Sequence, residues 1–161
     1  MKPLARLLLS CGGIGFLPKG SWVTIILTSF LWPWIFQLFP TTIEPRTTIF
    51  LALGLALLLL GAATIPWFCS DGRHDHEWIV FDEVLGTLIA ASPFFFLYST
   101  VSPLTAAIAT MCVFGFFDGL KPLGIQHIDD AEHVPITVML DDLVAGVYAA
   151  GVIFVGITLS L

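Results

Sequence analysis

Charged side chains are scarce in this sequence of 161 residues, where Asp, Glu, Lys and Arg together make up 11%. Soluble domains carry about 25% charged residues. Here 57% of the residues are hydrophobic, and the mean hydropathy is +0.96. This composition excludes an ordinary soluble globular protein and predicts an integral membrane protein. Only six residues are Lys or Arg, and the net charge of −6 argues against a nucleic-acid partner.

Cysteine is also rare, and its three positions, Cys11, Cys69 and Cys112, have no paired spacing. An odd count without a Cys-x-x-Cys pair excludes a disulfide framework and a cysteine-rich zinc site. Arg73 follows Cys69 after only three residues, so the cysteine-phosphatase pattern of Cys, five residues and Arg is missing as well. Any chemistry must therefore come from other side chains.

Apolar runs make up most of the chain and predict an all-α fold, a small polytopic membrane helix bundle in a single domain, residues 1–161. A stretch of about 20 apolar residues is long enough to cross the hydrocarbon core. The third run is predicted to bend at Pro93, because proline interrupts helix hydrogen bonding. The five predicted spans are Trp22–Phe39, Thr47–Phe68, Asp82–Tyr98, Leu104–Phe117 and Leu143–Leu161.

Five spans would place the N-terminus and the polar loops 69–81 and 118–140 on one side of the membrane. Five of the six basic residues fall on that side, and only Arg46 lies opposite. The positive-inside rule therefore predicts that this side is cytoplasmic. Eleven of the twelve acids lie on or border the same side, with Glu44 as the exception. Gly146 and Ala150, four residues apart, are expected to allow close helix packing in the last span.

Acidic residues gather where the apolar runs begin or end, as Asp82-Glu83, Asp118 and Asp141-Asp142. The simplest interpretation is helix capping, because a helix N-terminus favours a carboxylate by about 0.3–1 kcal/mol. Two unit charges 4 Å apart, however, repel by about 4 kcal/mol at an effective dielectric of 20. One acid would be enough for a cap, and Asp118 lies at a helix C-terminus, where the dipole disfavours it.

Carboxylates that converge at a membrane surface indicate a divalent cation, and oxygen ligands suit Mg²⁺ or Ca²⁺. Such a cation can polarise a phosphoryl oxygen and orient a water molecule. Lys121 follows Asp118 by three residues, on about the same helical face, and could meet a phosphate. The alternative for Lys121 is an interfacial lysine whose amine reaches for water.

Three segments of the chain resemble the signature blocks of the phosphatidylglycerophosphatase A family. Val80–Gly86, Phe117–Pro122 and Met139–Gly146 match blocks that read approximately V-x-D-E-x-x-G, F-D-x-x-K-P and D-D-x-x-A-G. The resemblance implies an enzyme of the bacterial inner (cytoplasmic) membrane, with its active site facing the cytoplasm. Its substrate would be the phospholipid phosphatidylglycerophosphate, hydrolysed with Mg²⁺ to phosphatidylglycerol and phosphate.

The resemblance also implies the site residues. The carboxylates are assigned to the metal and the attacking water, and the lysine to phosphate. The implied residues are Asp82, Glu83, Asp118, Lys121, Asp141 and Asp142.

The sequence departs from the family pattern in two places. Gly115 stands where the family has an arginine that could bind phosphate, and Gly15–Ser21 resembles a shortened form of the family's N-terminal loop. These departures leave open a non-catalytic relative that serves as an assembly partner. A small transporter is a further alternative, and the interiors of the first two spans count against it because they carry no acid.

Overall fold

The computed structural model describes residues 2–68, 76–97, 101–122, 124–125 and 137–160, and all the regular structure in this part of the chain is helical. The predicted all-α class is confirmed. Much of the predicted polar loops 69–81 and 118–140 lies outside the described residues. The elements are α1 (Lys2–Leu9), η1 (Ile14–Phe16), α2 (Gly20–Phe36), α3 (Ile43–Thr64), η2 (Ile65–Trp67), α4 (Phe81–Ala90), α5 (Ser92–Phe96), α6 (Pro103–Leu120) and α8 (Thr137–Ser160).

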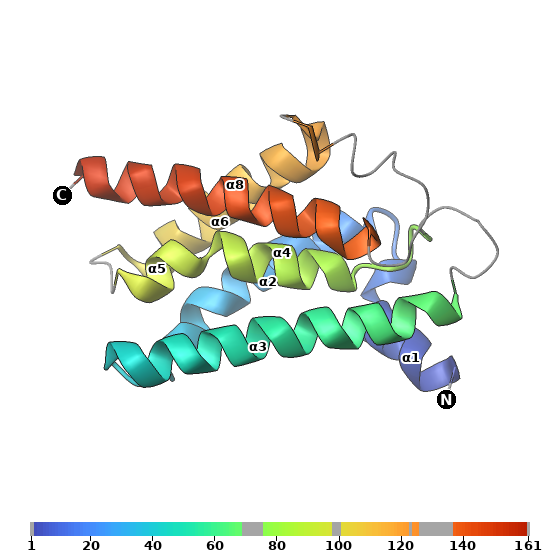
Figure 1. Ribbon diagram of the computed structural model, residues 1–161. Coiled ribbons are helices and arrows are strands. Elements are labelled where there is room, and N and C mark those ends of the chain that lie inside the picture. Colours follow the sequence, from blue (N-terminus) through green and yellow to red (C-terminus); the bar gives the residue numbers. More distant parts are fainter. Residues whose placement is uncertain (1, 69–75, 98–100, 123, 126–136, 161) are drawn as a thin grey trace.

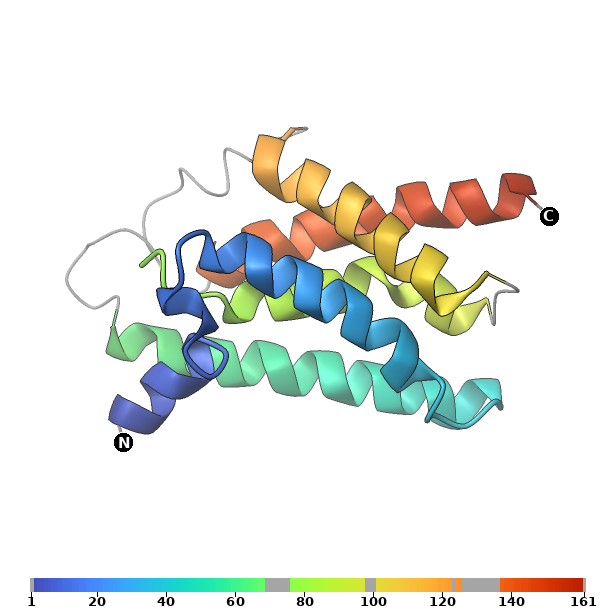
Figure 2. The same ribbon diagram turned by 180° about the vertical axis from the view of Figure 1, so that it is seen from behind.

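The long helices run alternately between the two ends of a bundle (Figures 1 and 2). One end holds α1, the starts of α4 and α8, and the end of α6. The opposite end holds α5, the starts of α3 and α6, and the C-terminal end of α8. The acids of α4, α6 and α8 therefore share one end, as the alternation of spans predicts. We call this the acid end and the other the far end.

Three helices are long and apolar enough to cross a membrane, over Ile43–Trp67, Pro103–Leu120 and Val138–Leu159. The helix α2 is also apolar but has 17 residues. The predicted third span is broken, because α4 ends at Ala90 and α5 begins at Ser92 with a proline in its first turn. The expected bend is thus present, while the count of five crossings stays a prediction.

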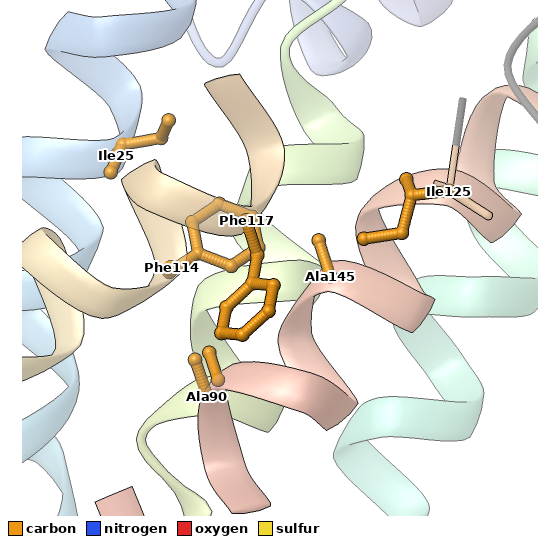
Figure 3. Packing of buried hydrophobic residues seen from close by; sticks show 7 residues of the cluster. Ile25, Ala90, Phe114, Phe117, Ile125 and Ala145 are labelled. Atoms are coloured by element: carbon orange, nitrogen blue, oxygen red, sulfur yellow. The ribbon is translucent and has the colours of Figure 1, made fainter. Parts of the chain in front are cut away.

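The short helix α4 lies inside the bundle and packs against α2, α3, α6 and α8. Eight of its ten residues are buried, Asp82 and Glu83 among them. Behind it, Phe114 and Phe117 of α6 pack with Ala90 and with Ala145 of α8 (Figure 3). Because neighbouring helices surround α4, carboxylates at its start are held in protein rather than in lipid.

The contact between α4 and α8 depends on two glycines. A Cβ added to Gly146 would lie 2.6 Å from the carbonyl oxygen of Gly86. A Cβ added to Gly86 would lie 2.5 Å from the Phe114 ring and 2.9 Å from the carbonyl oxygen of Asp142. The close helix approach predicted at Gly146 is confirmed. Because real Cβ atoms do not come so near, larger residues here would push the helices apart.

We expect Gly146→Ala to destabilise the protein by about 1–3 kcal/mol, because its methyl group would meet backbone that cannot move cheaply. Gly151→Ala, in the same helix, is the matched control, since a Cβ there meets nothing within 4 Å. The control should leave stability unchanged or raise it by up to about 1 kcal/mol, since alanine favours helix. Thermal unfolding in detergent measures both variants. Equal shifts would show that the Gly86 contact does not fix the helix spacing.

Candidate metal centre at the acid end

Three buried carboxylates meet where α4 and α8 pack together. Asp82 and Glu83 lie in the first turn of α4, while Asp142 comes from α8. One side-chain oxygen from each lies within 4.8 Å of the others. The three residues are only 5%, 6% and 4% exposed. Two oxygen ligands of one Ca²⁺ lie at most about 5.2 Å apart, and two of one Mg²⁺ at most about 4.2 Å. The spacing therefore admits Ca²⁺ directly and Mg²⁺ after a shift of a few tenths of an ångström.

Helix capping explains part of this arrangement but not Asp142. The sequence predicts that Asp141-Asp142 opens the last helix. In the structure α8 begins a turn earlier, at Thr137, so this expectation was wrong. A helix N-terminus stabilises acids mainly within its first turn. The burial of Asp142 among carboxylates therefore needs another source of stabilisation.

The donor chemistry of this cluster fits a hard divalent cation. Buried charges need partners, yet Glu83 Oε2 is buried and has no hydrogen-bond partner in the described part of the chain. The Glu83 backbone N–H donates to Asp82 Oδ1 at 3.1 Å, which still leaves carboxylate oxygens for a ligand. Because the three acids offer oxygen only, the cluster suits Mg²⁺ or Ca²⁺ better than Zn²⁺.

Asp118 lies beside the three carboxylates without being one of them. It sits in the last turn of α6 and is half-buried. Its charge repels those of Glu83 and Asp142, so it adds to the negative field of the cluster. Its predicted role as a metal ligand stays a prediction.

Lys121 and Asp141 form an ion pair next to the cluster. Lys121 Nζ lies 2.7 Å from Asp141 Oδ2, and the two side chains are 25% and 10% exposed. Lys121 lies just outside α6, because this helix ends at Leu120 and Lys121 adopts a left-handed backbone with φ of 44°. The expectation that it shares a helical face with Asp118 was therefore wrong. Asp141 lies outside the group of three, and its metal role stays a prediction.

The sequence singled out Gly15–Ser21 as a shortened family loop, but it did not predict the contacts of the N-terminal segment with the start of α4. The Val80 N–H donates to the Leu9 carbonyl at 2.9 Å, which joins the end of α1 to the start of α4. Gly15 lies against the Trp78 carbonyl, where a Cβ has no room. Ser21, in the first turn of α2, interacts with the Glu83 side chain. The glycines of this loop were the available signal, because they permit such close backbone contacts.

Cys11 is a second residue that the sequence did not single out. Its thiol donates to the Val80 carbonyl at 3.6 Å, and its φ is 49°. Burial raises the pKa of the Cys11 thiol to about 11, and the Glu83 charge adds to the rise. Cys11 is thus an inert thiol at neutral pH whose titration reports the charge on Glu83.

Gly115, where the sequence lacks the expected arginine, lies against Trp22 of α2. A Cβ added to Gly115 would lie 3.1 Å from the Trp22 ring, which covers this part of α6. A longer side chain at residue 115 would therefore have to displace Trp22. In this structure the Trp22 ring occupies the space next to Gly115.

We expect Glu83→Gln to speed alkylation of Cys11, because removing the carboxylate charge lowers the thiol pKa. At pH 9 a pKa of about 11 leaves roughly 1% thiolate, so a several-fold rise is measurable. The rate is followed by mass spectrometry in a Cys69→Ser, Cys112→Ser background. Glu44→Gln is the control, because this exposed acid lies at the start of α3, at the opposite end of the bundle from Cys11. Equal rates in both variants would contradict the predicted coupling.

Comparison with known proteins agrees with the three sequence blocks. A family model described as phosphatidylglycerophosphatase A matches residues 7–157. The phosphatidylglycerophosphatase A of Haemophilus influenzae is 33% identical over 109 residues, covering 66% of this chain and 63% of the relative. That of Escherichia coli is 32% identical over 103 residues, covering 61% and 57%. A Bacteroides thetaiotaomicron protein, provisionally named a phosphatidylinositol-3-phosphatase, is 29% identical over 138 residues, covering 85% and 83%.

The match spans less than two thirds of the length of the Haemophilus and Escherichia relatives. No solved structure matches the chain. The family model nevertheless covers almost the whole sequence and includes every residue of the acid cluster. The chain belongs to the phosphatidylglycerophosphatase A family.

Proposed function

We propose that this protein is a Mg²⁺-dependent lipid phosphatase that hydrolyses phosphatidylglycerophosphate to phosphatidylglycerol and phosphate. The observation that carries the proposal is the meeting of Asp82, Glu83 and Asp142 within 4.8 Å in a buried position. Membership of the family supports the lipid substrate. The apolar helices support a membrane location.

The three buried carboxylates hold the cation in this proposal, because their oxygens converge and Glu83 Oε2 has no other described partner. A bound Mg²⁺ supplies positive charge that polarises a phosphoryl oxygen and lowers the pKa of bound water. Asp118 lies beside the cluster and keeps partial exposure, which suits a group that orients the attacking water. In this assignment the three buried carboxylates hold the cation, and Asp118 orients the water.

Lys121 is placed to receive the phosphate of the substrate. Its amine is partly exposed and lies near the cluster through its ion pair with Asp141. We propose that Asp141 positions this amine, since a salt bridge of 2.7 Å restricts the flexible lysine side chain. The pair would then provide phosphate binding that an arginine at residue 115 does not provide here.

The membrane orientation follows from charge. Lys2, Arg6, Lys19 and Lys121 belong to the acid end, and Arg46 to the far end. With the positive-inside rule we propose that the acid end faces the cytoplasm. Membership of the family supports the bacterial inner membrane as the location. A phosphate on a lipid of the cytoplasmic leaflet would reach the acids at the ends of the helices.

A non-catalytic relative is the second candidate, and the Trp22 ring over Gly115 favours it, because a presumed phosphate-binding group is replaced. The Bacteroides relative suggests a third outcome, in which another phospholipid monoester is the substrate. Both alternatives predict that purified protein releases little or no phosphate from phosphatidylglycerophosphate, whereas the main proposal predicts release.

We expect purified protein to release phosphate from phosphatidylglycerophosphate with Mg²⁺ and to lose this activity in EDTA. Asp82→Asn and Asp142→Asn should each lower the rate by about 100-fold or more, because metal-dependent charge stabilisation is worth several kcal/mol. Glu44→Gln, on an exposed acid at the far end, is the control and should keep full activity. Folded protein that binds Mn²⁺ but releases no phosphate from any phospholipid monoester would contradict the enzyme proposal.

The roles of Lys121 and Asp141 are separated by a double-mutant cycle. We expect Lys121→Met to raise KM for the lipid about tenfold or more, since it removes a charge-assisted contact to phosphate. Adding Asp141→Asn should then change little, because residues that act through one another are not additive. If Asp141 instead binds the metal directly, Asp141→Asn will raise the Mg²⁺ concentration needed for half-maximal activity, even in the Lys121→Met background.

A further inference from the structure

The far end of the bundle contains a buried cation that the proposed reaction does not use. Arg46 lies in the first turn of α3 and is only 4% exposed. Its guanidinium carbon lies 4.4 Å from the centroid of the Phe95 ring. Phe95 is itself held by Phe36 and Phe50, with ring centroids 4.5 and 5.3 Å away. The aromatic cluster thus fixes one face of the guanidinium.

A cavity of about 330 Å³ has Arg46 in its wall. Arg46 and Gln37 supply polar groups to its wall, and Pro33, Phe36, Phe94 and Pro103 supply apolar ones. A water molecule occupies about 30 Å³, so the space is large enough for a phosphate group with part of a glycerol. Three further cavities, lined by residues such as Leu4, Leu55 and Met111, have no Asp, Glu, Lys, Arg or His among their lining residues.

The charge of this cavity is set by Arg46. The helices α3 and α6 begin beside it, whereas α2 and α5 end there, so their opposing partial charges largely cancel. Glu44 is the only acid among the described residues of the far end, and its side chain is exposed. A buried guanidinium at a cavity wall, with an amide beside it, is suited to bind an oxyanion.

The surroundings of the cavity indicate where such an anion comes from. Leu38, Ile43 and Leu104 are 85%, 58% and 56% exposed around the helix ends. Trp34, also exposed, is the type of residue that anchors a protein at the membrane interface. An apolar rim at the level of the helix ends favours a lipid headgroup over a dilute soluble anion as the source.

We propose that the cavity lined by Arg46 and Gln37 binds the phosphate of a phospholipid headgroup in the leaflet at the far end. The guanidinium binds the phosphate oxygens, and the Gln37 amide donates to the headgroup. The lipid thereby joins the starts of α3 and α6 to the end of α2. This site is separate from the acid cluster and does not depend on the proposed reaction.

The test is lipid-dependent thermal stability of the full chain in detergent with EDTA, so that no turnover occurs. Dioleoylphosphatidylglycerol should raise the unfolding temperature, while dioleoylglycerol, which lacks phosphate, should not. Arg46→Met should weaken lipid binding at least about tenfold, and Arg46→Lys should keep part of it. Asp82→Asn, at the acid end, should keep the full lipid effect.

Two results would overturn the proposal. The first is an unchanged lipid-dependent shift in Arg46→Met. The second is a rise in unfolding temperature with inorganic phosphate as large as the rise with the lipid. That result would indicate a general anion site and exclude specific binding of a phospholipid. If Arg46→Met does not fold, Gln37→Leu decides, because it keeps the buried charge and removes only the amide. An unaltered lipid affinity in Gln37→Leu and in Arg46→Lys would then contradict the site.

Discussion

The close contact of α4 and α8 is the constraint on which the rest of the structure depends. Carboxylates from two helices share one cation only if the backbones approach closely, and Gly86 and Gly146 leave the room for that approach. The same contact brings Asp142 to Asp82 and Glu83. Repulsion among the acids opposes it, and packing of α4 inside the bundle resists the repulsion. A bound cation would offset the repulsion among the three carboxylates and so stabilise the contact between α4 and α8.

Much of this arrangement could be predicted from the sequence, because apolar length and charge position are local properties. The helical class, the break near Pro93 and the shared end of the acids follow from where apolar runs start and stop. The choice of Gly146 as a packing position follows from small residues four apart. These features need no knowledge of which side chains touch.

Other features depend on contacts between distant parts of the chain and could not be predicted. The start of α8 at Thr137 was missed because Asp141-Asp142 interrupts the apolar run, so the pattern suggests a boundary at the acids. The salt bridge of Lys121 arises because the backbone turns left-handed after Leu120. The placement of Cys11 and Ser21 near Glu83 requires the N-terminal loop to return to the start of α4. A lone arginine such as Arg46 indicates orientation, but its cavity appears only in three dimensions.

The origin of the three carboxylates in α4 and α8 has a consequence for biosynthesis. The chain is made from the N-terminus, so Asp82 and Glu83 enter the membrane long before Asp142 is translated. During that interval two neighbouring acids lie at the head of a short helix without the carboxylate of Asp142 beside them. Only insertion of the final helix completes the set. In the proposed function, cation capture would therefore mark the moment at which assembly is complete, and a chain truncated before Asp142 would lack the third carboxylate.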